Sequence, residues 1–217
     1  MKKFELTNEF ITNMFGTKLF RIRALVEFGD VEAGELGGYV EKESNLGHDD
    51  NAWVYGNARV YGDAQVSGDA LVYGNARVYG NAWVYGNALV CGNALVYDNA
   101  WVYGNARVCG DALVCGNARV CSDALVCGNA RVCSDEDYAY AHGFGSVNRT
   151  TTFFRLKDGG VGVRCGCFYG TLAQFRDKIR ETHGETKKAQ EYLMLADLME
   201  LRFEEDENEV GNRKYVE

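Results

Sequence analysis

A hydrophobic pattern with a period of six residues runs through the middle of the chain. From Ala52 to Val132 the triplet Ala-x-Val recurs fourteen times, and mostly Tyr or Cys, then Gly, then Asn or Asp separate the triplets. Within a triplet, Ala and Val lie on one side of a short strand and the middle residue lies on the other. Gly and Asn favour the turn that follows. Such repetition is typical of a solenoid, and we expect three strands per coil with Ala and Val inside.

These units resemble the repeats of the hexapeptide-repeat superfamily, in which an aliphatic residue comes two positions after a small one. Val and Ala take these positions here, and two degenerate units, "GYV" at 38–40 and "SNL" at 44–46, precede the regular ones. The resemblance implies a mainly β fold, a left-handed parallel β-helix. In that superfamily Gly usually follows the aliphatic residue directly. Here Gly comes one position later, which leaves the geometry of the corners open.

With eighteen residues per coil, the outward residues stack into one ladder on each of three faces. The ladders are Trp53, Leu71, Leu89, Arg107 and Leu125; Arg59, Arg77, Leu95, Leu113 and Arg131; and Gln65, Trp83, Trp101 and Arg119. Exposed apolar ladders favour association, so we expect a homo-oligomer. The resemblance favours a trimer of columns packed side by side, although singly exposed Leu and Trp residues are also tolerated on protein surfaces.

The repeats divide the chain into an N-terminal cap (1–37), a β-helix (38–133) and a C-terminal α+β module (134–217). In the cap, strand-like alternation flanks the turn "MFGTK". The strings "IRALVEFGDVEAGELGGYVEKESNLG" and "NAWVYGNARVYG" also resemble a family of uncharacterised phage and prophage proteins.

The C-terminal module carries signals for a β-hairpin followed by two helices. We expect strands over 151–156 and 161–168 around the turn "KDGG", a helix capped by Thr171 that ends near Gly184, a second helix over 187–204, and an acidic tail.

Composition narrows the class of protein. The formal net charge is −8, which argues against binding to a nucleic acid polymer. No apolar run approaches the ~20 residues that span a bilayer, and the first residues lack the hydrophobic stretch of a signal peptide. We therefore expect no membrane association and a cytoplasmic protein, in the cytoplasm of the host cell if it is encoded by a phage. Six of the eight cysteines occupy the repeat position that Tyr otherwise fills, so we expect reduced thiols.

One histidine lies where acyl-transfer chemistry is conceivable. The hexad register slips by two residues at "GHDD" (47–50), so this segment should bulge from a corner. Many hexapeptide-repeat proteins are acyltransferases with a histidine base, and His48 is the candidate here. The bulge is equally explained as an adaptor between an irregular first coil and the regular column.

The charge of the module points to an anion site. Residues 149–188 carry nine basic and four acidic side chains. Guanidinium groups and hydroxyls bind anionic oxygens. The candidate ligand-binding residues are Arg149, Thr150, Thr152, Arg155 and Arg164, with Trp83 and Trp101 to stack on a base. Edge-strand threonines and surface arginines explain the same pattern without a ligand.

The leading hypothesis is a non-enzymatic binding protein of phage or prophage type. One version is a counter-defence sponge that sequesters a small anionic ligand such as a signalling nucleotide. The alternatives are an acyltransferase that uses His48 and a structural scaffold that binds a host protein. We expect no cofactor and no metal, and we interpret "CGC" at 165–167 as cysteines within a strand, with both thiols on one face.

Overall fold

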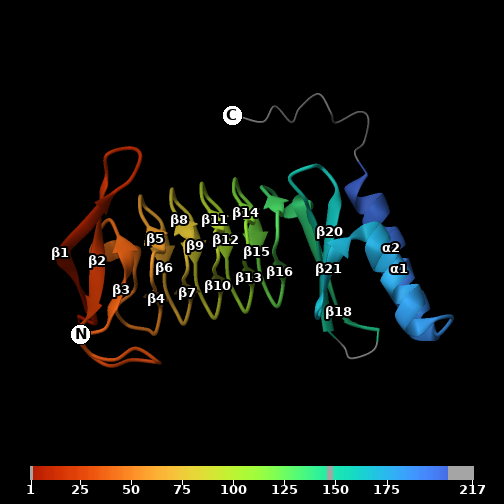
Figure 1. Ribbon diagram of the computed structural model, residues 1–217, viewed down its shortest axis with the longest axis horizontal. Helices are drawn as coiled ribbons and strands as arrows, with labels where there is room; N and C mark the ends of the chain where they lie inside the picture. Colours follow the sequence, from red (N-terminus) through yellow and green to blue (C-terminus); the bar gives the residue numbers. More distant parts are fainter. Residues whose placement is uncertain (1, 146–148, 205–217) are drawn as a thin grey trace.

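The chain forms a column of coils with a strand assembly at one end and a sheet with two helices at the other. A computed structural model describes residues 2–145 and 149–204, and these three parts follow one another along the long axis (Figure 1). The acidic tail expected at the C-terminus lies outside the described residues.

The column consists of fourteen strands of two residues each. They are β4 (Trp53–Val54), β5 (Arg59–Val60), β6 (Gln65–Val66), β7 (Leu71–Val72), β8 (Arg77–Val78), β9 (Trp83–Val84), β10 (Leu89–Val90), β11 (Leu95–Val96), β12 (Trp101–Val102), β13 (Arg107–Val108), β14 (Leu113–Val114), β15 (Arg119–Val120), β16 (Leu125–Val126) and β17 (Arg131–Val132). Every third strand pairs in parallel, so the column has three sheets: β4-β7-β10-β13-β16, β6-β9-β12-β15, and one that contains β5-β8-β11-β14-β17. The three-sided parallel β-solenoid and its three ladders are confirmed, and the left hand of the coil stays a prediction.

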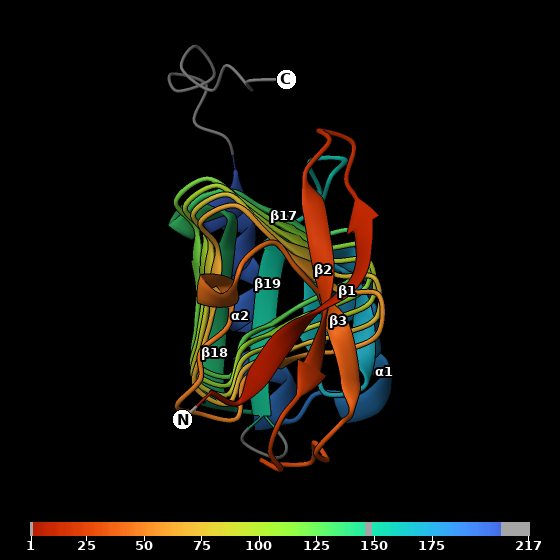
Figure 2. The same ribbon diagram turned by 90° about the vertical axis from the view of Figure 1, so that its left-hand side faces the viewer.

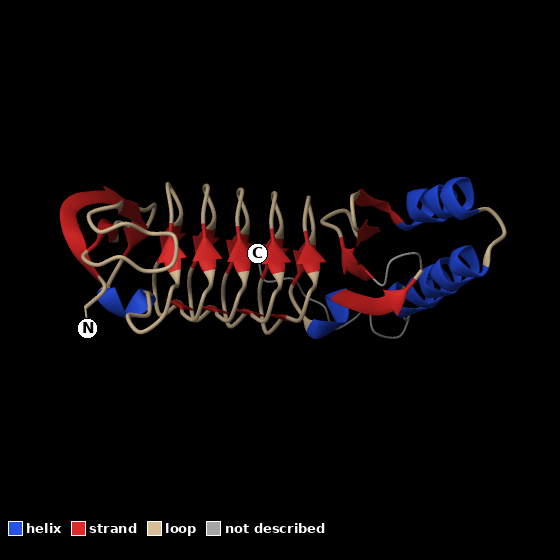
Figure 3. Ribbon diagram, turned by 90° about the horizontal axis from the view of Figure 1, so that it is seen from below, coloured by secondary structure: helices blue, strands red, loops and turns tan. Residues whose placement is uncertain are grey.

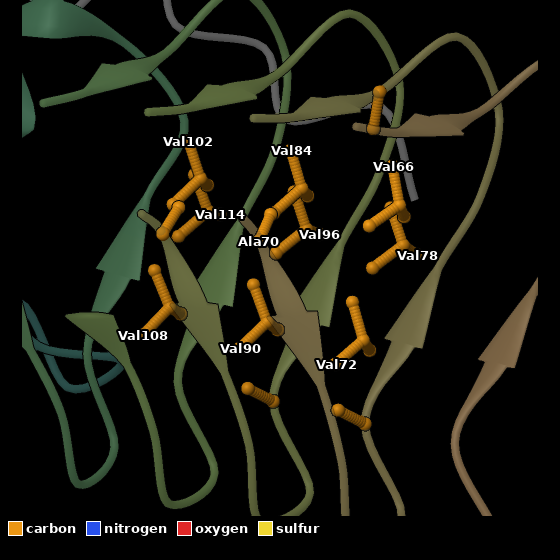
Figure 4. Packing of buried hydrophobic residues seen from close by; sticks show 14 of the residues in the cluster. Val66, Ala70, Val72, Val78, Val84, Val90, Val96, Val102, Val108 and Val114 are labelled. Atoms are coloured by element: carbon orange, nitrogen blue, oxygen red, sulfur yellow. The ribbon is translucent and has the colours of Figure 1, made fainter. Parts of the chain in front are cut away.

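The Ala and Val of each triplet form the core of the column. All fourteen of each are fully buried, and the valines of successive coils stack inside the column (Figure 4). Seen along the column, the coils superimpose (Figure 2). Burial of this continuous apolar stack stabilises each coil through its neighbours.

The corners have a simple geometry because the residue at the Gly position takes a left-handed backbone conformation. Gly92, for example, has φ 71°, and Asp98 and Ser122, which replace Gly at this position, adopt φ 58° and 57°. Asn side chains next to the corners form hydrogen bonds from coil to coil, such as Asn93 Nδ2 to Asp111 Oδ1 at 2.9 Å. The later position of Gly is therefore compatible with a regular coil.

One pair of cysteines on a corner is joined covalently. Cys115 and Cys133 lie on consecutive coils with their Cα atoms 4.3 Å apart, and they form a disulfide. The expectation that the thiols are reduced is wrong for this pair, because the stacking of coils brings equivalent positions into disulfide range.

The N-terminal strands extend one sheet of the column. β1 (Phe4–Thr12) pairs antiparallel with β2 (Lys18–Ala24), and β2 pairs antiparallel with β3 (Leu36–Val40), which confirms the strand–turn–strand expected in the cap. β3 is parallel to β5, with Tyr39 opposite Arg59. This spacing of twenty residues, in place of eighteen, shows the two-residue slip that the sequence predicts. A short 3-10 helix, η1 (Glu43–Asn45), follows β3.

The inserted segment 47–50 is held by a buried lysine. Lys3 Nζ donates hydrogen bonds to the Asp50 carbonyl oxygen at 2.7 Å and to the Ala52 carbonyl oxygen at 2.9 Å. Lys3 is 3% exposed, and burial lowers the pKa of its ammonium group. These contacts fix the segment against the cap.

The C-terminal module is a four-stranded antiparallel sheet covered by two helices. After a short 3-10 helix, η2 (Asp135–Asp137), come β18 (Tyr138–Phe144), β19 (Arg149–Arg155), β20 (Val161–Cys165), β21 (Phe168–Thr171), α1 (Leu172–His183) and α2 (Lys187–Phe203). Both predicted helices are confirmed, including the capping box of Thr171 and Gln174. The sequence predicts only a hairpin; it misses β18, and it merges β20 and β21 into one strand.

The sheet of the module packs between the column and the helices. Phe154 and Leu156 belong to the core of the column, whereas Phe153 and Val163 pack with residues of α1 and α2. The two helices lie on the side of the sheet that faces away from the coils (Figures 1 and 3). Over the described ranges, no helix is long and apolar enough to cross a membrane.

Candidate anion-binding hollow in the C-terminal module

A half-open hollow of about 240 Å³ lies between the β20–β21 turn and α1. Arg149 from β19, Lys178 and His183 from α1, and Tyr192 from α2 are among the residues that line it. Three potentially cationic side chains thus surround one cavity, in a protein whose net charge is negative.

The position of Arg149 depends on a glycine in the turn between β20 and β21. Gly166 has φ 58°, and a Cβ atom at this residue would collide with Arg149 Nη1. The guanidinium group therefore lies directly over the turn. Gly166 permits both the turn and this close approach.

Helix α1 presents one face to the hollow. Its residues Phe175, Lys178, Ile179 and Thr182 line the cavity, and they recur at the intervals of three and four residues that place side chains on one side of a helix. Lys178 Nζ forms an exposed ion pair with Glu181 at 2.8 Å. Such pairs contribute little to stability, so the ammonium group can turn towards an anion.

Aromatic rings form the apolar part of the hollow. The ring centroids of Phe168 and Phe175 lie 5.4 Å apart, and those of Phe175 and Tyr192 lie 5.8 Å apart. His183 stacks on Tyr192 with centroids 5.9 Å apart. The hollow therefore combines positive charge with flat apolar surfaces, which suits an anion that carries a ring.

Two thiols also line the hollow, but they do not lie in one strand as the sequence predicts. β20 ends at Cys165, while Gly166 and Cys167 form the turn that leads to β21. Cys165 Sγ accepts a hydrogen bond from the Thr151 hydroxyl at 3.2 Å. The glycine explains the difference, because it allows the chain to reverse between the two cysteines. Within the described ranges, no group of three or more His, Cys, Asp or Glu side chains could hold a metal ion.

Of the seven residues predicted to bind a ligand, only Arg149 lines this hollow. Arg155 lies elsewhere: it donates hydrogen bonds to the carbonyl oxygens of Phe203 at 3.1 Å and Gly159 at 3.3 Å, and it pairs with Asp137 at 3.7 Å. Its guanidinium group connects the C-terminal end of α2 to the sheet.

Two further predicted residues contact other parts of the protein. Thr152 Oγ1 accepts a hydrogen bond from the backbone N–H of Leu125 at 2.9 Å, so it faces the column. Arg164 is opposite Thr152 in the sheet, and its charge acts on Cys127 in the last coil. The remaining threonine, Thr150, contacts the His142 ring at 3.0 Å.

The two predicted tryptophans lie on the column. Trp83 and Trp101 stack on each other with centroids 5.6 Å apart, and the guanidinium group of Arg119 lies 5.3 Å from the Trp101 ring. Both faces of Trp101 are therefore covered. Their strands, β9 and β12, belong to the column rather than to the module (Figure 1), so the structure does not bring them together with Arg149.

The candidate base His48 packs against the N-terminal strand. Its Nδ1 atom accepts a hydrogen bond from the Lys3 backbone N–H at 3.2 Å, and its ring stacks on Phe4 with centroids 4.4 Å apart. One ring nitrogen is thus engaged within the cap.

Sequence reasoning missed Lys178, His183, Phe168 and Tyr192 as site residues. The helical phase carried a usable signal, because Phe175, Lys178 and Thr182 lie on one face of the helix that begins after Thr171. The approach of Tyr192 from the second helix depends on tertiary packing, which no local pattern specifies.

Comparison with known proteins supports the repeat architecture. The family model described as the YdcK beta solenoid repeat matches residues 52–68, 64–79, 70–86, 88–104 and 100–116. All five matches lie within the column, and none reaches the module that contains the hollow. No curated protein matches the chain.

Proposed function

We propose that the protein is a non-enzymatic binding protein whose C-terminal module takes up a small anionic ligand with a flat apolar group. The observation that carries this proposal is the convergence of Arg149, Lys178 and His183 on one hollow that also contains the Phe168 and Tyr192 rings. The column serves as the rigid body to which the module is attached.

The chemistry of the hollow defines the ligand class. Arg149 offers a planar, permanently charged donor to a phosphate or carboxylate, and Lys178 adds a mobile positive charge. Phe168 is half-buried and offers a surface for a ring, and the buried Tyr192 contributes to the apolar wall. The volume of about 240 Å³ is just below the usual range of ligand sites, which favours an anion of mononucleotide size or smaller.

The biological setting follows from the resemblances of the sequence. Likeness to phage and prophage proteins supports a phage-encoded protein, for which we propose the cytoplasm of the host cell. Sequestration of a signalling mononucleotide as a counter-defence activity is the version of this function that fits the size of the hollow.

A panel of probes tests the ligand class. Thermal unfolding is measured with AMP, with adenosine, which lacks the anion, and with inorganic phosphate, which lacks the ring. We expect AMP to raise the melting temperature more than either fragment, because it engages the cations and the rings together. Equal shifts with phosphate and AMP would mean that the rings take no part, and no shift with any anion would contradict the proposal.

A further inference from the structure

Helix α2 carries an apolar stripe that the described parts of its own chain leave exposed. Met194, Leu198 and Leu201 are 71%, 54% and 67% exposed, whereas Tyr192 and Ala196 on the other side of the helix are buried. Intervals of four and three residues place the three exposed side chains in one line along the helix. Apolar residues at the a and d positions of a coiled coil have this spacing.

The column offers less apolar surface than its sequence suggests. The five leucines of its ladders are each half-buried, because neighbours in the ladder cover one another, and Trp83 is 42% exposed. Elsewhere in the described ranges, Met14 and Phe15 are more exposed still, but they are adjacent residues in a tight turn. β18 carries two exposed aromatic side chains, Tyr140 at 41% and Phe144 at 42%, but among the described elements α2 alone carries three large apolar side chains that are more than half exposed.

The charges along α2 indicate how a partner helix would run. Lys187 and Lys188 are exposed in its first turn. At the other end Glu200 and Glu204 are exposed, and Arg202 in the last turn donates to the Asp135 carbonyl oxygen at 3.4 Å. The sequence continues after Glu204 with three more acids. A second α2 in the antiparallel direction places basic ends beside acidic ends, and it also opposes the helix dipoles favourably. A parallel partner would place like charges together.

We propose that two copies of this chain pair through antiparallel α2 helices. In the register that keeps the stripe continuous, Met194 of each copy packs on Leu198 of the other, and the basic first turn of each helix lies at the level of the acidic end of the other. Both helices of the module lie at the end of the molecule away from the N-terminal strands (Figure 3). The product is a two-fold dimer joined end to end, in place of a trimer joined through the columns.

Light scattering after size-exclusion chromatography measures the mass of the particle at a series of protein concentrations, and this mass tests the interface. The account predicts twice the chain mass of 24.1 kDa for the full-length protein. Leu198→Glu should give a folded monomer, because Leu198 is exposed in the single chain. Trp83→Glu, the matched change on the column, should remain a dimer.

A charge exchange tests the antiparallel direction. Lys188→Glu alone and Glu204→Lys alone should each raise the dissociation constant of the dimer about twofold, because each puts like charges at the same level, and the double variant should restore it. A trimer that persists with Leu198→Glu, dissociation by Trp83→Glu, or a wild-type monomer at all concentrations would overturn the proposal. Failure of the double variant to restore pairing would exclude the antiparallel register.

Discussion

The Thr152 hydroxyl in the C-terminal sheet accepts a hydrogen bond from the backbone N–H of Leu125 at 2.9 Å. In earlier coils of the same face, the equivalent N–H groups of Leu89 and Arg107 donate to the carbonyl oxygens of Ala106 and Ala124 in the next coil. Leu125 belongs to the last coil of its face. The module therefore provides the acceptor that a further coil would have supplied.

Replacement of Thr152 should destabilise the end of the column. Thr152→Val removes the acceptor and leaves a buried N–H unsatisfied, which should lower the free energy of unfolding by about 1–3 kcal/mol. Thr152→Ser should retain most of the stability. Urea unfolding measures both. Because Thr152 faces the column, neither variant should change anion binding, and a loss of binding in Thr152→Ser would contradict this assignment.

A corner glycine of the column should tolerate a side chain less well than the glycine in the turn between β1 and β2. Gly92 has φ 71°, and a Cβ atom there would lie 2.9 Å from the Gly110 nitrogen; Gly16 has φ 81° with no atom within 4 Å. Gly16→Ala should cost only the conformational strain, about 1–2 kcal/mol. Gly92→Ala should cost more, because it also separates two coils. Equal losses in thermal unfolding would show that the close contact between coils is unimportant.

A second disulfide should form on another corner of the column. Cys91, Cys109 and Cys127 have the same spacing of eighteen residues as the bonded pair Cys115 and Cys133. The pKa of Cys127 is lowered, chiefly by a hydrogen bond from the Cys109 thiol and further by the charge of Arg164, which favours the reactive thiolate.

Oxidised glutathione, a two-electron acceptor, should remove the two thiol hydrogens from one neighbouring pair of these three cysteines and be reduced to two molecules of glutathione. Peptide mapping should find Cys109 in the new disulfide, joined to Cys91 or Cys127. Cys109→Ser should form no disulfide between Cys91 and Cys127, because these two residues are two coils apart. A bond between these two residues would contradict the coil geometry.

The stacked tyrosines should make the protein less stable at alkaline pH. Tyr79 lies between Tyr61 and Tyr97, with ring centroids 5.0 Å apart on both sides. Burial, and then the neighbouring phenols, raise the pKa of Tyr79 to about 12 from its ordinary value of 10.0. Between these pH values the folded state binds more protons than the unfolded state, so the free energy of unfolding should fall as the pH rises above 10.

Denaturation at a series of alkaline pH values measures this effect. Tyr79→Phe keeps the stacked ring but removes the ionisable group, so its stability should fall less steeply above pH 10 than that of the wild type. Identical slopes for the two proteins would show that Tyr79 ionises normally in the folded state.

The column could be derived from the sequence because each of its positions has a local requirement. Ala and Val at fixed intervals define the buried side, and Gly and Asn define the corners, so the partners of Trp83 and Leu95 follow from counting eighteen residues. The module was derived less completely. Its helices carry their own caps, but β18 pairs with β19 through contacts that the "YAYAHGF" pattern does not specify locally.

The candidate site was only partly predictable for the same reason. Arg149 was identified from residue type and local charge. Arg155 and Arg164 have the same chemistry, but alternation along the sheet and the position of α2 direct them to Phe203 and towards Cys127. Lys178 and Tyr192 reach the hollow only when α1 and α2 pack against the sheet. Residue chemistry alone cannot separate arginines that bind ligands from those that join elements.

Isothermal titration calorimetry with AMP tests the central claim most directly. Arg149→Ala should weaken binding at least about tenfold, the loss expected for one charged hydrogen bond, while the melting temperature of the free protein stays unchanged. Arg77→Ala, an exposed arginine on the column, should bind as the wild type does. Wild-type affinity in Arg149→Ala, or equal weakening in both variants, would contradict an anion site in the hollow of the C-terminal module.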